Sequence, residues 1–432
     1  MFQPILFECL KQGYSFSFFK RDVLSGLTVA VVAVPLSIAF AIASGATPTI
    51  GLFTAIIGGF IVSFLGGSKY NISGPAGAFI GVIFGVIAHY GYNGLLISNF
   101  MAGIFLILFA IFKLGKFVKK IPNVVITGFS LGLGLDIFSG QVPDFFGFKY
   151  YGSHAFLTRW HSYFELFKNI HFTSFAIGIL TLITAIILKI KKPKWPAFLI
   201  AIIISTIISQ LLSLNIETLY SRFGAIQLTL PEFHHSILDE IEHPTHLFQY
   251  IIPALTIAFL AGIEALLSAT IADKIASSKH KSNTELFGQG IANLILPLFG
   301  CLPVAGTTAR TIVNVNSGAK SPISGMLHSV FILIFLAIFA KLIVKINMPT
   351  IAGILFIVAI NMMSVKKIIS ILKHNIWIEK IIVLSTAICV ITNGIVVAIF
   401  ANSIAYYILL KLNNKRFSRK QLNIQTKDNN IR

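Results

Sequence analysis

The dominant pattern along the chain is a series of apolar runs of about 20 residues, the length that a helix needs to cross a bilayer. Short loops containing Gly, Pro, Asn or Lys separate these runs. The pattern predicts about fourteen membrane spans, two of them short and polar. The predicted spans are Val23–Ala43, Ile50–Leu65, Pro75–Tyr90, Leu95–Leu114, Pro122–Phe138, Ser174–Ile190, Pro196–Leu212, Ile251–Ile271, Glu285–Phe299, Gly306–Asn316, Gly325–Leu342, Met348–Met363, Trp377–Thr392 and Ile395–Leu412.

The distribution of lysines predicts that both termini are cytoplasmic, because cytoplasmic loops collect Lys and Arg. Alternate loops carry the lysines Lys116, Lys119, Lys120, Lys191, Lys192, Lys194, Lys274, Lys279, Lys281, Lys366, Lys367 and Lys373. The long loop Ser213–Tyr250, predicted to lie on the opposite side, is instead rich in acids: Glu232, Asp239, Glu240 and Glu242. We therefore expect an interfacial segment at 1–21, a transmembrane domain at 22–412 and a basic cytoplasmic tail at 413–432.

Composition agrees with a multi-pass protein of the inner (cytoplasmic) membrane. The chain is 56% hydrophobic and only 11% charged, far less charged than a soluble protein of this size. Its formal net charge of +19 does not indicate nucleic-acid binding, because the basic residues lie in loops and in the tail. The N-terminus has no signal-peptide pattern. The three cysteines, Cys9, Cys301 and Cys389, lack the spacing of a metal site or a disulfide framework.

Two stretches of the chain resemble each other. In Gly51–Gly67 and Glu285–Cys301, the pairs Leu52/Leu286, Phe53/Phe287, Ile61/Ile295 and Gly66/Gly300 share one offset. The offset covers seven predicted spans, so the second half must be inverted relative to the first. We expect inverted repeats over about 22–212 and 251–412. Paired, interrupted segments in inverted halves indicate the central binding site of a transporter.

Each repeat contains such an interrupted segment. NISGPAGAF (Asn71–Phe79) breaks the first half at Gly74-Pro75, and GCLPVAGTTARTIVNVNS (Gly300–Ser317) breaks the second at Pro303 and Gly306. Non-helical backbone at membrane depth is tolerated where it lines a cavity. Helices beginning near Gly74 and Gly306 would point the positive ends of their dipoles at one place. Together with Thr307, Thr308 and Arg310, these ends predict a seat for an anion.

A second candidate group lies on the span Ile251–Ile271. Glu264 is at its middle and Ser268 is one turn further on, on the same face. A carboxylate in the membrane must pair with a cation, bind an ion or take a proton. Three alternatives stay open for Glu264: a fixed ion pair with Arg310, a sodium ion, or a proton.

Other polar residues in the apolar runs are given smaller roles. For Asp136, a role in packing and a role in function both stay open. His328 and Asn361 are expected to be satisfied by hydrogen bonds between helices. We expect Asp22, Asp273 and Glu285 to lie near the membrane surface, where capping and solvation suffice.

At these residues the chain resembles the SulP family of inorganic anion transporters, which includes sulfate permeases, bicarbonate transporters and prestin-like exchangers. The resemblance runs from about Asp22 to Leu412 and is carried by DVLSGLTVAVVAVPLSIAFAIASGATPTIGL, SKYNISGPAGAFIGV and GIEALLSATIADKIASSKHKSNTELFGQGIANLILPLFGCLPVAGTTARTIVNVNSGAKSP. It implies an all-α fold of seven plus seven inverted spans, shared with uracil permeases, in which a core domain moves like an elevator. About 20 residues follow Leu412, so we expect no C-terminal STAS domain.

The resemblance also implies roles for individual residues. Glu264, Ser268, Gly306 and Thr308 match the sodium site of bicarbonate transporters, although Glu264 stands where that family has an aspartate. Ala309 and Arg310 match a Ser-Arg pair at the anion site of the prestin-like members. The remaining positions that match substrate-binding residues are Leu36, Phe40 and Ala76.

These observations predict secondary active transport of a small inorganic anion, sulfate or bicarbonate, held between the two helix ends. The expected partners are this anion and the lipid bilayer; no cofactor is expected beyond a coupling sodium ion or proton, and a homodimer stays open. One alternative is a passive anion channel, and another is a dicarboxylate or nucleobase permease on the same fold. No pairing of nucleophile and base, phosphate loop or metal cluster indicates an enzyme.

Overall fold

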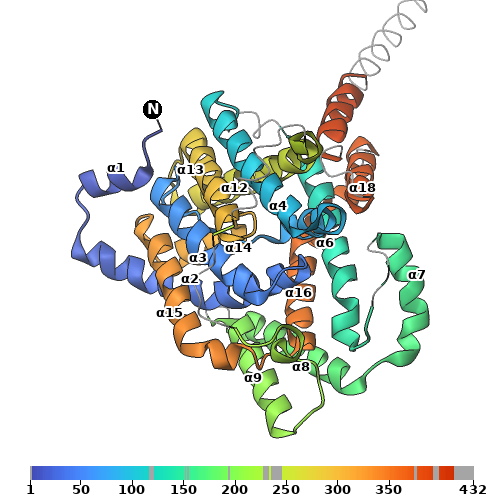
Figure 1. Cartoon of the computed structure of the whole chain (residues 1–432). Helices are drawn as coiled ribbons and strands as arrows, with labels where there is room; N and C mark the ends of the chain where they lie inside the picture. Colours follow the sequence, from blue (N-terminus) through green and yellow to red (C-terminus); the bar gives the residue numbers. More distant parts are fainter. Residues whose placement is uncertain are drawn as a thin grey trace, which may run out of the picture. The chain divides into compact units, whose positions relative to one another are not determined.

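The computed structural model describes residues 2–115, 121–150, 152, 155–192, 195–226, 233–234, 246–373, 377–392 and 398–412. Lys116, Lys119, Lys120, Lys194, the four acids of the loop before Tyr250 and the tail after Leu412 lie outside these ranges. The described chain is almost entirely helical, as predicted (Figure 1).

The first half of the chain follows the predicted order of spans. Its elements are α1 (Ile5–Lys11), α2 (Phe16–Ala43), α3 (Pro48–Leu65), β1 (Ser73–Gly74), η1 (Gly77–Phe79), α4 (Ile80–Ile111), α6 (Asn123–Phe146), α7 (Phe156–Leu166), η2 (Phe167–Asn169), α8 (Phe172–Lys191), α9 (Ala197–Leu211) and α10 (Leu219–Phe223). α4 is interrupted at Gly91, where φ is 71° and ψ is 179°, so the predicted break between Tyr90 and Leu95 is confirmed.

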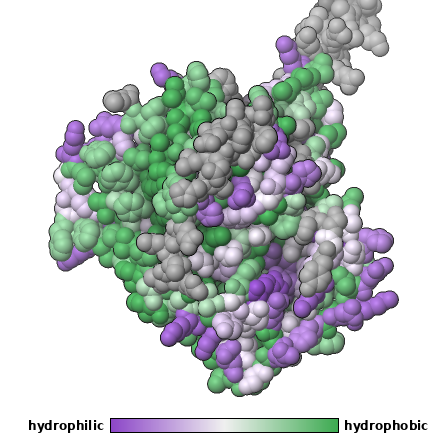
Figure 2. All heavy atoms as spheres, in the orientation of Figure 1, coloured by the Kyte–Doolittle hydropathy of each residue, from purple (hydrophilic) through white to green (hydrophobic). Residues whose placement is uncertain are grey.

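The second half repeats this plan. Its elements are η3 (His246–Tyr250), α12 (Ile251–Ala276), α13 (Ser282–Ile295), η4 (Leu296–Phe299), β2 (Ala305–Gly306), α14 (Thr308–Asn316), α15 (Ile323–Ile343), α16 (Met348–Met362), α17 (Val365–Lys373) and α18 (Trp377–Ile391). A shorter apolar helix covers Ala398–Leu412. Eight helices of the described chain are long and apolar enough to cross a membrane, and hydrophobic side chains cover much of the face in Figure 2.

The N-terminal segment differs from the expectation in its boundaries. α2 begins at Phe16 and not at Val23, because the Ser15 hydroxyl caps its first turn and no Gly or Pro lies between Phe16 and Val23. The preceding helix is therefore only the short α1, whose Ile5, Leu6 and Cys9 are buried.

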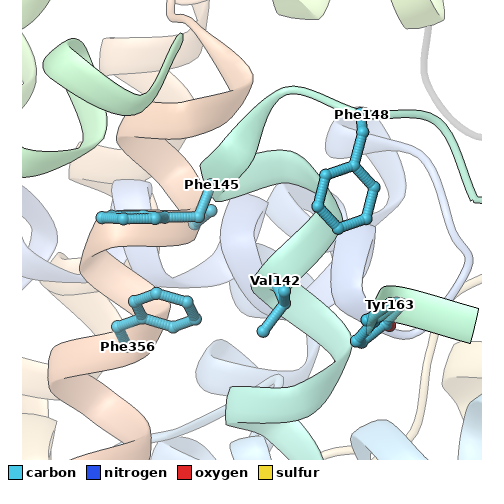
Figure 3. Packing of buried hydrophobic residues seen from close by; sticks show 6 residues of the cluster. Val142, Phe145, Phe148, Tyr163 and Phe356 are labelled. Carbon is cyan, nitrogen blue, oxygen red and sulfur yellow. The ribbon is translucent and has the colours of Figure 1, made fainter. Parts of the chain in front are cut away.

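The helices form two compact units. One contains Met1–Lys119 and Ile137–Val358, and the other contains Lys120–Asp136 and Ala359–Arg432. In the first unit, an aromatic cluster joins α6, α7 and α16 (Figure 3). The Phe145 and Phe356 rings lie 4.6 Å apart between centroids, and the buried Tyr163 hydroxyl donates to the Ser139 carbonyl (3.2 Å). Aromatic pairs of this kind contribute beyond the area they bury. In the second unit, Val124 and Val125 of α6 pack against α18.

Outside the predicted spans, the first unit carries an ion-pair cluster beside a cavity of about 390 Å³. Arg222 of α10 donates to both carboxylate oxygens of Asp144, at 3.1 and 2.7 Å, and to both of Glu217, at 3.0 and 2.5 Å. The hydrogen bonds and charge of Arg222 lower the pKa of Glu217 below its ordinary value of 4.5.

This pKa shift predicts a pH-dependent contribution to stability. A carboxylate with a lowered pKa in the folded state stabilises the protein above its unfolded pKa, and that stabilisation is lost as the pH falls through the lowered value. We expect Glu217→Gln to decrease the free energy of unfolding at pH 7 by about 0.2–1 kcal/mol, as for other partly exposed pairs. The difference from wild type should shrink as the pH falls below 4.5.

Thermal unfolding in detergent across this pH range would measure the effect. Glu165→Gln is the matched control, because Glu165 is exposed and makes no ion pair within the described residues. A Glu217→Gln effect that stays constant with pH would contradict the prediction.

Candidate functional site

The two interrupted segments meet in the first unit. β1 pairs with β2 in an antiparallel ladder, in which Ser73 lies opposite Gly306 and Gly74 opposite Ala305. Antiparallel pairing is expected of two equivalent segments that enter from opposite sides. The structure therefore brings Gly74 and Gly306, far apart in the sequence, to one place.

A short helix starts directly after each strand. The first begins at Gly77, with Ala76 as its N-cap, and continues through η1 into α4. The second is α14, which begins at Thr308. The expected starts at Gly74-Pro75 and near Gly306 are therefore a few residues too early, because those residues are used in the strand pair.

The first turns of these helices leave backbone donors free. The first intrahelical bond of α14 runs from the Thr311 N–H to the Thr307 carbonyl (3.0 Å). Within the described residues, the N–H groups of Gly77 and Ala78 on one side, and of Thr308 and Ala309 on the other, have no acceptor. Free N–H groups at helix N-termini attract anions.

The side chains around α14 divide into two groups. Thr307 is buried, and both its N–H (2.8 Å) and its hydroxyl (3.1 Å) donate to the Ile72 carbonyl, so Thr307 holds the two segments together and has no free donor for an anion. Thr308 is half-buried and Ala309 is exposed, so the accessible face of α14 starts at these two residues.

Arg310 points away from that face and is fully buried. Its Nη2 donates to the Ser37 hydroxyl of α2 (3.1 Å) and to the Pro75 carbonyl (3.3 Å), whereas Nε and Nη1 have no partner. No ion pair joins Arg310 to Glu264 in the part of the chain that the structure describes. The alternative of a fixed pair between them is therefore not supported, and the positive charge of Arg310 is uncompensated.

The two strand glycines are required by their neighbours. A Cβ at Gly74 would overlap Nη1 of Arg310, and a Cβ at Gly306 would overlap the side-chain amide of Asn71. The small residues that the sequence associates with close approach of an anion are thus also needed for packing.

The predicted cation-coupling residues lie on α12, beside α14. Glu264 is partly exposed and makes no hydrogen bond or ion pair within the described residues. Ser268 is buried, and its hydroxyl donates to Thr311 (2.9 Å), not to Thr308. The Thr308 side chain has no hydrogen-bond partner within the described residues either. Because Ser268 is the donor in its bond to Thr311, its oxygen lone pairs stay available to a cation beside Glu264 and Thr308.

Comparison with known proteins identifies the family to which the chain belongs. A model of the sulfate permease family matches residues 19–386, most of the chain. The chain belongs to the sulfate permease family. Within it, the chain is 41% identical over 366 residues to the putative sulfate transporter YvdB of Bacillus subtilis (strain 168), covering 84% of this chain and 68% of YvdB.

A bicarbonate transporter, BicA of Picosynechococcus sp., is 33% identical over 356 residues. The match covers 80% of this chain but only 62% of BicA, less than two thirds of that protein. The solved transmembrane domain of a cyanobacterial BicA superposes with a TM-score of 0.76 at 29% identity, covering 91% of this chain and 98% of that domain.

A solved structure of SLC26A9 has a TM-score of 0.79 at 14% identity, which shows a shared fold alone. The sulfate permease family member described here is thus a multi-pass membrane protein with seven plus seven spans in an inverted repeat. The predicted family and fold class are confirmed.

The other matched positions are placed as follows. Leu36 and Phe40 are buried in α2, and Ala76 is buried at the N-cap of η1. Asp136 is half-buried, and its role stays open between packing and function. Asn361 is exposed, and its expected hydrogen bond between helices stays a prediction.

Sequence reasoning missed a buried polar network behind the strand pair. Glu285 of α13 was expected near the membrane surface, but it is only 1% exposed. Its carboxylate accepts from the Gly67 N–H (2.9 Å), the Ser68 N–H (3.1 Å), the Asn71 amide (2.6 Å) and the Gln289 amide (3.3 Å). Glu285 thus holds the segment that leads into β1 against α13. Gln289 and Asn293, the polar residues in the otherwise apolar run 286–299, were the available signal.

The network continues on both sides of Glu285. Thr311 donates to the Asn71 amide oxygen (3.1 Å), and the Gln289 amide donates to the Ser73 hydroxyl (2.6 Å). Asn293 bonds to the residue directly before β2: its amide donates to the Val304 carbonyl (3.0 Å) and accepts from the Val304 N–H (2.8 Å). The two strands are therefore braced by side chains from α13 and α14.

Two further expectations are wrong. Asp22 is fully buried and accepts from the Lys320 N–H (2.6 Å) and the Ser321 hydroxyl (2.6 Å), so it fastens α2 to the segment after α14. His328 of α15 is also fully buried, but neither of its ring nitrogens has a hydrogen-bond partner among the residues that the structure describes. The positions of Asp22 and His328 in the sequence gave no indication of the bonds of Asp22 or of the unpartnered ring of His328 within the described residues.

The network predicts that Glu285 is required for stability. Glu285→Ala should leave four donors without an acceptor, and losing a buried charged acceptor costs about 3 kcal/mol or more. We expect a large fall in the thermal unfolding temperature of the purified protein. Glu165→Ala, which removes an exposed acid, should have little effect. Equal unfolding temperatures for the two variants would contradict the bracing role.

Proposed function

We propose that this protein is a secondary active transporter that moves sulfate or bicarbonate across the cytoplasmic membrane. The anion is bound between the first turns of η1 and α14, next to Arg310, and is carried by an elevator-type movement of the unit that holds the strand pair. Both termini face the cytoplasm, which the distribution of lysines supports.

The observation that carries this proposal is the uncompensated charge of Arg310. An arginine in a membrane interior normally pairs with an acid or faces a ligand. Arg310 has two unpartnered nitrogens and no acidic partner within the described residues, and two helix ends with free N–H groups meet beside it. A small anion supplies the missing negative charge.

The geometry supports a division of labour at this site. The backbone N–H groups of Thr308 and Ala309 lie on the accessible face and contact the anion directly. Arg310 lies behind them, against Ser37 and Pro75, and contributes a fixed positive potential. Because the surroundings are apolar, this potential is screened less than it would be in water.

A driving ion is needed for uptake against a negative-inside potential, since moving one charge against 100 mV costs about 2.3 kcal/mol. Glu264 is the residue best placed to bind it, as a proton or together with a sodium ion. Its carboxylate lies on the helix that packs against α14, is partly exposed and has no partner within the described residues.

The alternatives differ from this proposal in measurable ways. A passive channel would use the same residues but could not accumulate its anion. A nucleobase permease is expected to carry an acid in the tenth span, where this chain has Arg310. Uptake of labelled sulfate and bicarbonate into proteoliposomes, with and without sodium or pH gradients, separates these functions and identifies the anion.

Replacing Arg310 should greatly weaken transport. Arg310→Met keeps much of the side-chain volume but removes the charge, and an interaction with a charged group is worth about 1.5–3 kcal/mol. We therefore expect anion affinity and uptake at low concentration to fall by about 10-fold to 100-fold. Arg310→Lys should retain more activity than Arg310→Met, because it keeps the charge.

Equilibrium binding of the labelled anion, with thermal unfolding as a folding check, would measure this loss. Arg222→Met is the matched control, because it removes an arginine that two acids already neutralise. A folded Arg310→Met protein with unchanged affinity would rule out the proposed role.

Replacing Glu264 should uncouple transport from its driving ion. In Glu264→Gln the side chain cannot take up a proton or supply a charged ligand for sodium. We expect uptake to lose its dependence on the sodium or proton gradient, while exchange of anion for anion continues. Asp136→Asn, which alters a second acid within an apolar helix, serves as the comparison.

Two results would argue against coupling through Glu264. The first is wild-type uptake that responds to neither gradient. The second is a Glu264→Gln protein that keeps the full response of wild type.

A further inference from the structure

α17 is a short helix of the second unit with an unusual surface. It covers Val365–Lys373, between α16 and α18. Nine residues of helix are about 14 Å long, too short to cross a bilayer. Ser364, with a left-handed φ of 50°, separates it from α16, and the Ser364 carbonyl accepts from the N–H groups of Lys367 (2.8 Å) and Ile368 (3.3 Å). α17 is thus a separate helix with its own start after α16.

The side chains of α17 fall on two faces. Lys366, Lys367 and Lys373 are all exposed. Val365, Ile369 and Leu372, spaced i, i+4 and i+7, lie along one edge of the helix. These three side chains are 45%, 46% and 50% exposed. α17 therefore presents an uncovered apolar edge beside a row of lysines.

The side of α17 that is packed does not include this edge. Ile371 contacts the buried cluster of Val124, Val125 and α18 in the same unit. That contact holds the helix against its own unit and leaves the opposite edge open. Trp377, at the start of α18, is half-exposed, and tryptophan is enriched at the boundary between membrane and water.

We infer that α17 lies in the membrane interface and binds anionic phospholipid, with Val365, Ile369 and Leu372 among the upper acyl chains and Lys366, Lys367 and Lys373 at the phosphate groups. An apolar edge flanked by lysines is the pattern of an interfacial helix. α17 contains no acidic residue. Each lysine near an anionic membrane surface adds about fivefold to binding.

The charge of α17 favours lipid over a second copy of the chain as the occupant of the edge. In a symmetric dimer the same patch meets itself. The three lysines of one α17 would then lie against the three of the other, with no acid on either helix to compensate. Anionic headgroups instead neutralise the lysines. The inference does not depend on which anion is transported.

The test measures lipid retained by the purified full-length protein. Native mass spectrometry would compare phosphatidylglycerol with phosphatidylcholine for wild type and for Lys366→Gln/Lys367→Gln/Lys373→Gln. We expect wild type to retain phosphatidylglycerol in preference to phosphatidylcholine. In the triple variant this preference should be at least about fivefold weaker, because a single lysine contributes about fivefold. The corresponding arginine variant should keep it.

The control is Lys189→Gln/Lys191→Gln/Lys192→Gln, which removes the same charge from the end of α8. This control should lose less of the preference than the α17 variant. The inference is overturned if the α17 glutamine variant retains phosphatidylglycerol as wild type does, or if the control loses as much as the α17 variant.

A second measurement tests the position of the apolar edge. Ile369→Cys, in a Cys389→Ser background because Cys9 and Cys301 are buried, can carry a nitroxide label in vesicles of phosphatidylcholine and phosphatidylglycerol. If dissolved oxygen reaches the label more readily than a water-soluble nickel complex does, the label lies within the membrane, and this result supports the inference. Preferential access by the nickel complex, or a short distance between labels on two copies, would overturn it.

Discussion

The structure depends on how it satisfies polar backbone at membrane depth. Interrupting two spans exposes N–H and carbonyl groups that water cannot reach, and each one left unsatisfied would cost several kcal/mol. β1 and β2 solve part of this problem by pairing with each other. Buried side chains satisfy further backbone groups nearby: Glu285 accepts from the Gly67 and Ser68 N–H groups, and Asn293 bonds to both backbone groups of Val304. Because these groups are satisfied by the protein, the free donors that remain are concentrated at the starts of the two helices.

Arg310 adds a charge that no acid in the described part of the chain neutralises. Its guanidinium fills the space that Gly74 leaves open and bonds only to neutral oxygens of Ser37 and Pro75. A buried cation without an acidic partner is costly in a membrane. The cost is lowered whenever a small anion occupies the nearby helix ends, so the charge that destabilises the empty site favours the occupied one.

Much of this arrangement could be predicted from the sequence, because its signals are local or repeated. Apolar length predicts the spans, and the Gly and Pro in Asn71–Phe79 and Pro303–Gly306 predict where they break. The shared offset of the two halves predicts that the breaks meet. Arg310 is conspicuous in an apolar chain. The fold and the place of the site therefore follow from composition and spacing.

The partners of individual polar groups could not be predicted in the same way. Glu285 and Asp22 flank apolar runs, where an acid is usually solvated, and only the three-dimensional arrangement shows that distant N–H groups surround them. Thr307 and Thr308 are adjacent in sequence, yet the Thr307 hydroxyl donates to the Ile72 carbonyl, whereas Thr308 is accessible. If a helix starts two residues later, different backbone N–H groups are left without an intrahelical acceptor. Sequence patterns do not determine helix boundaries to within two residues.

The central claim is that the transported anion is bound by the two helix ends next to Arg310. A structure determined with that anion bound tests it most directly, with selenate in place of sulfate if sulfate is transported. The account predicts density within hydrogen-bond distance of the N–H groups of Thr308 or Ala309 and of Gly77 or Ala78. Anion density elsewhere, with these helix ends unoccupied, would contradict it.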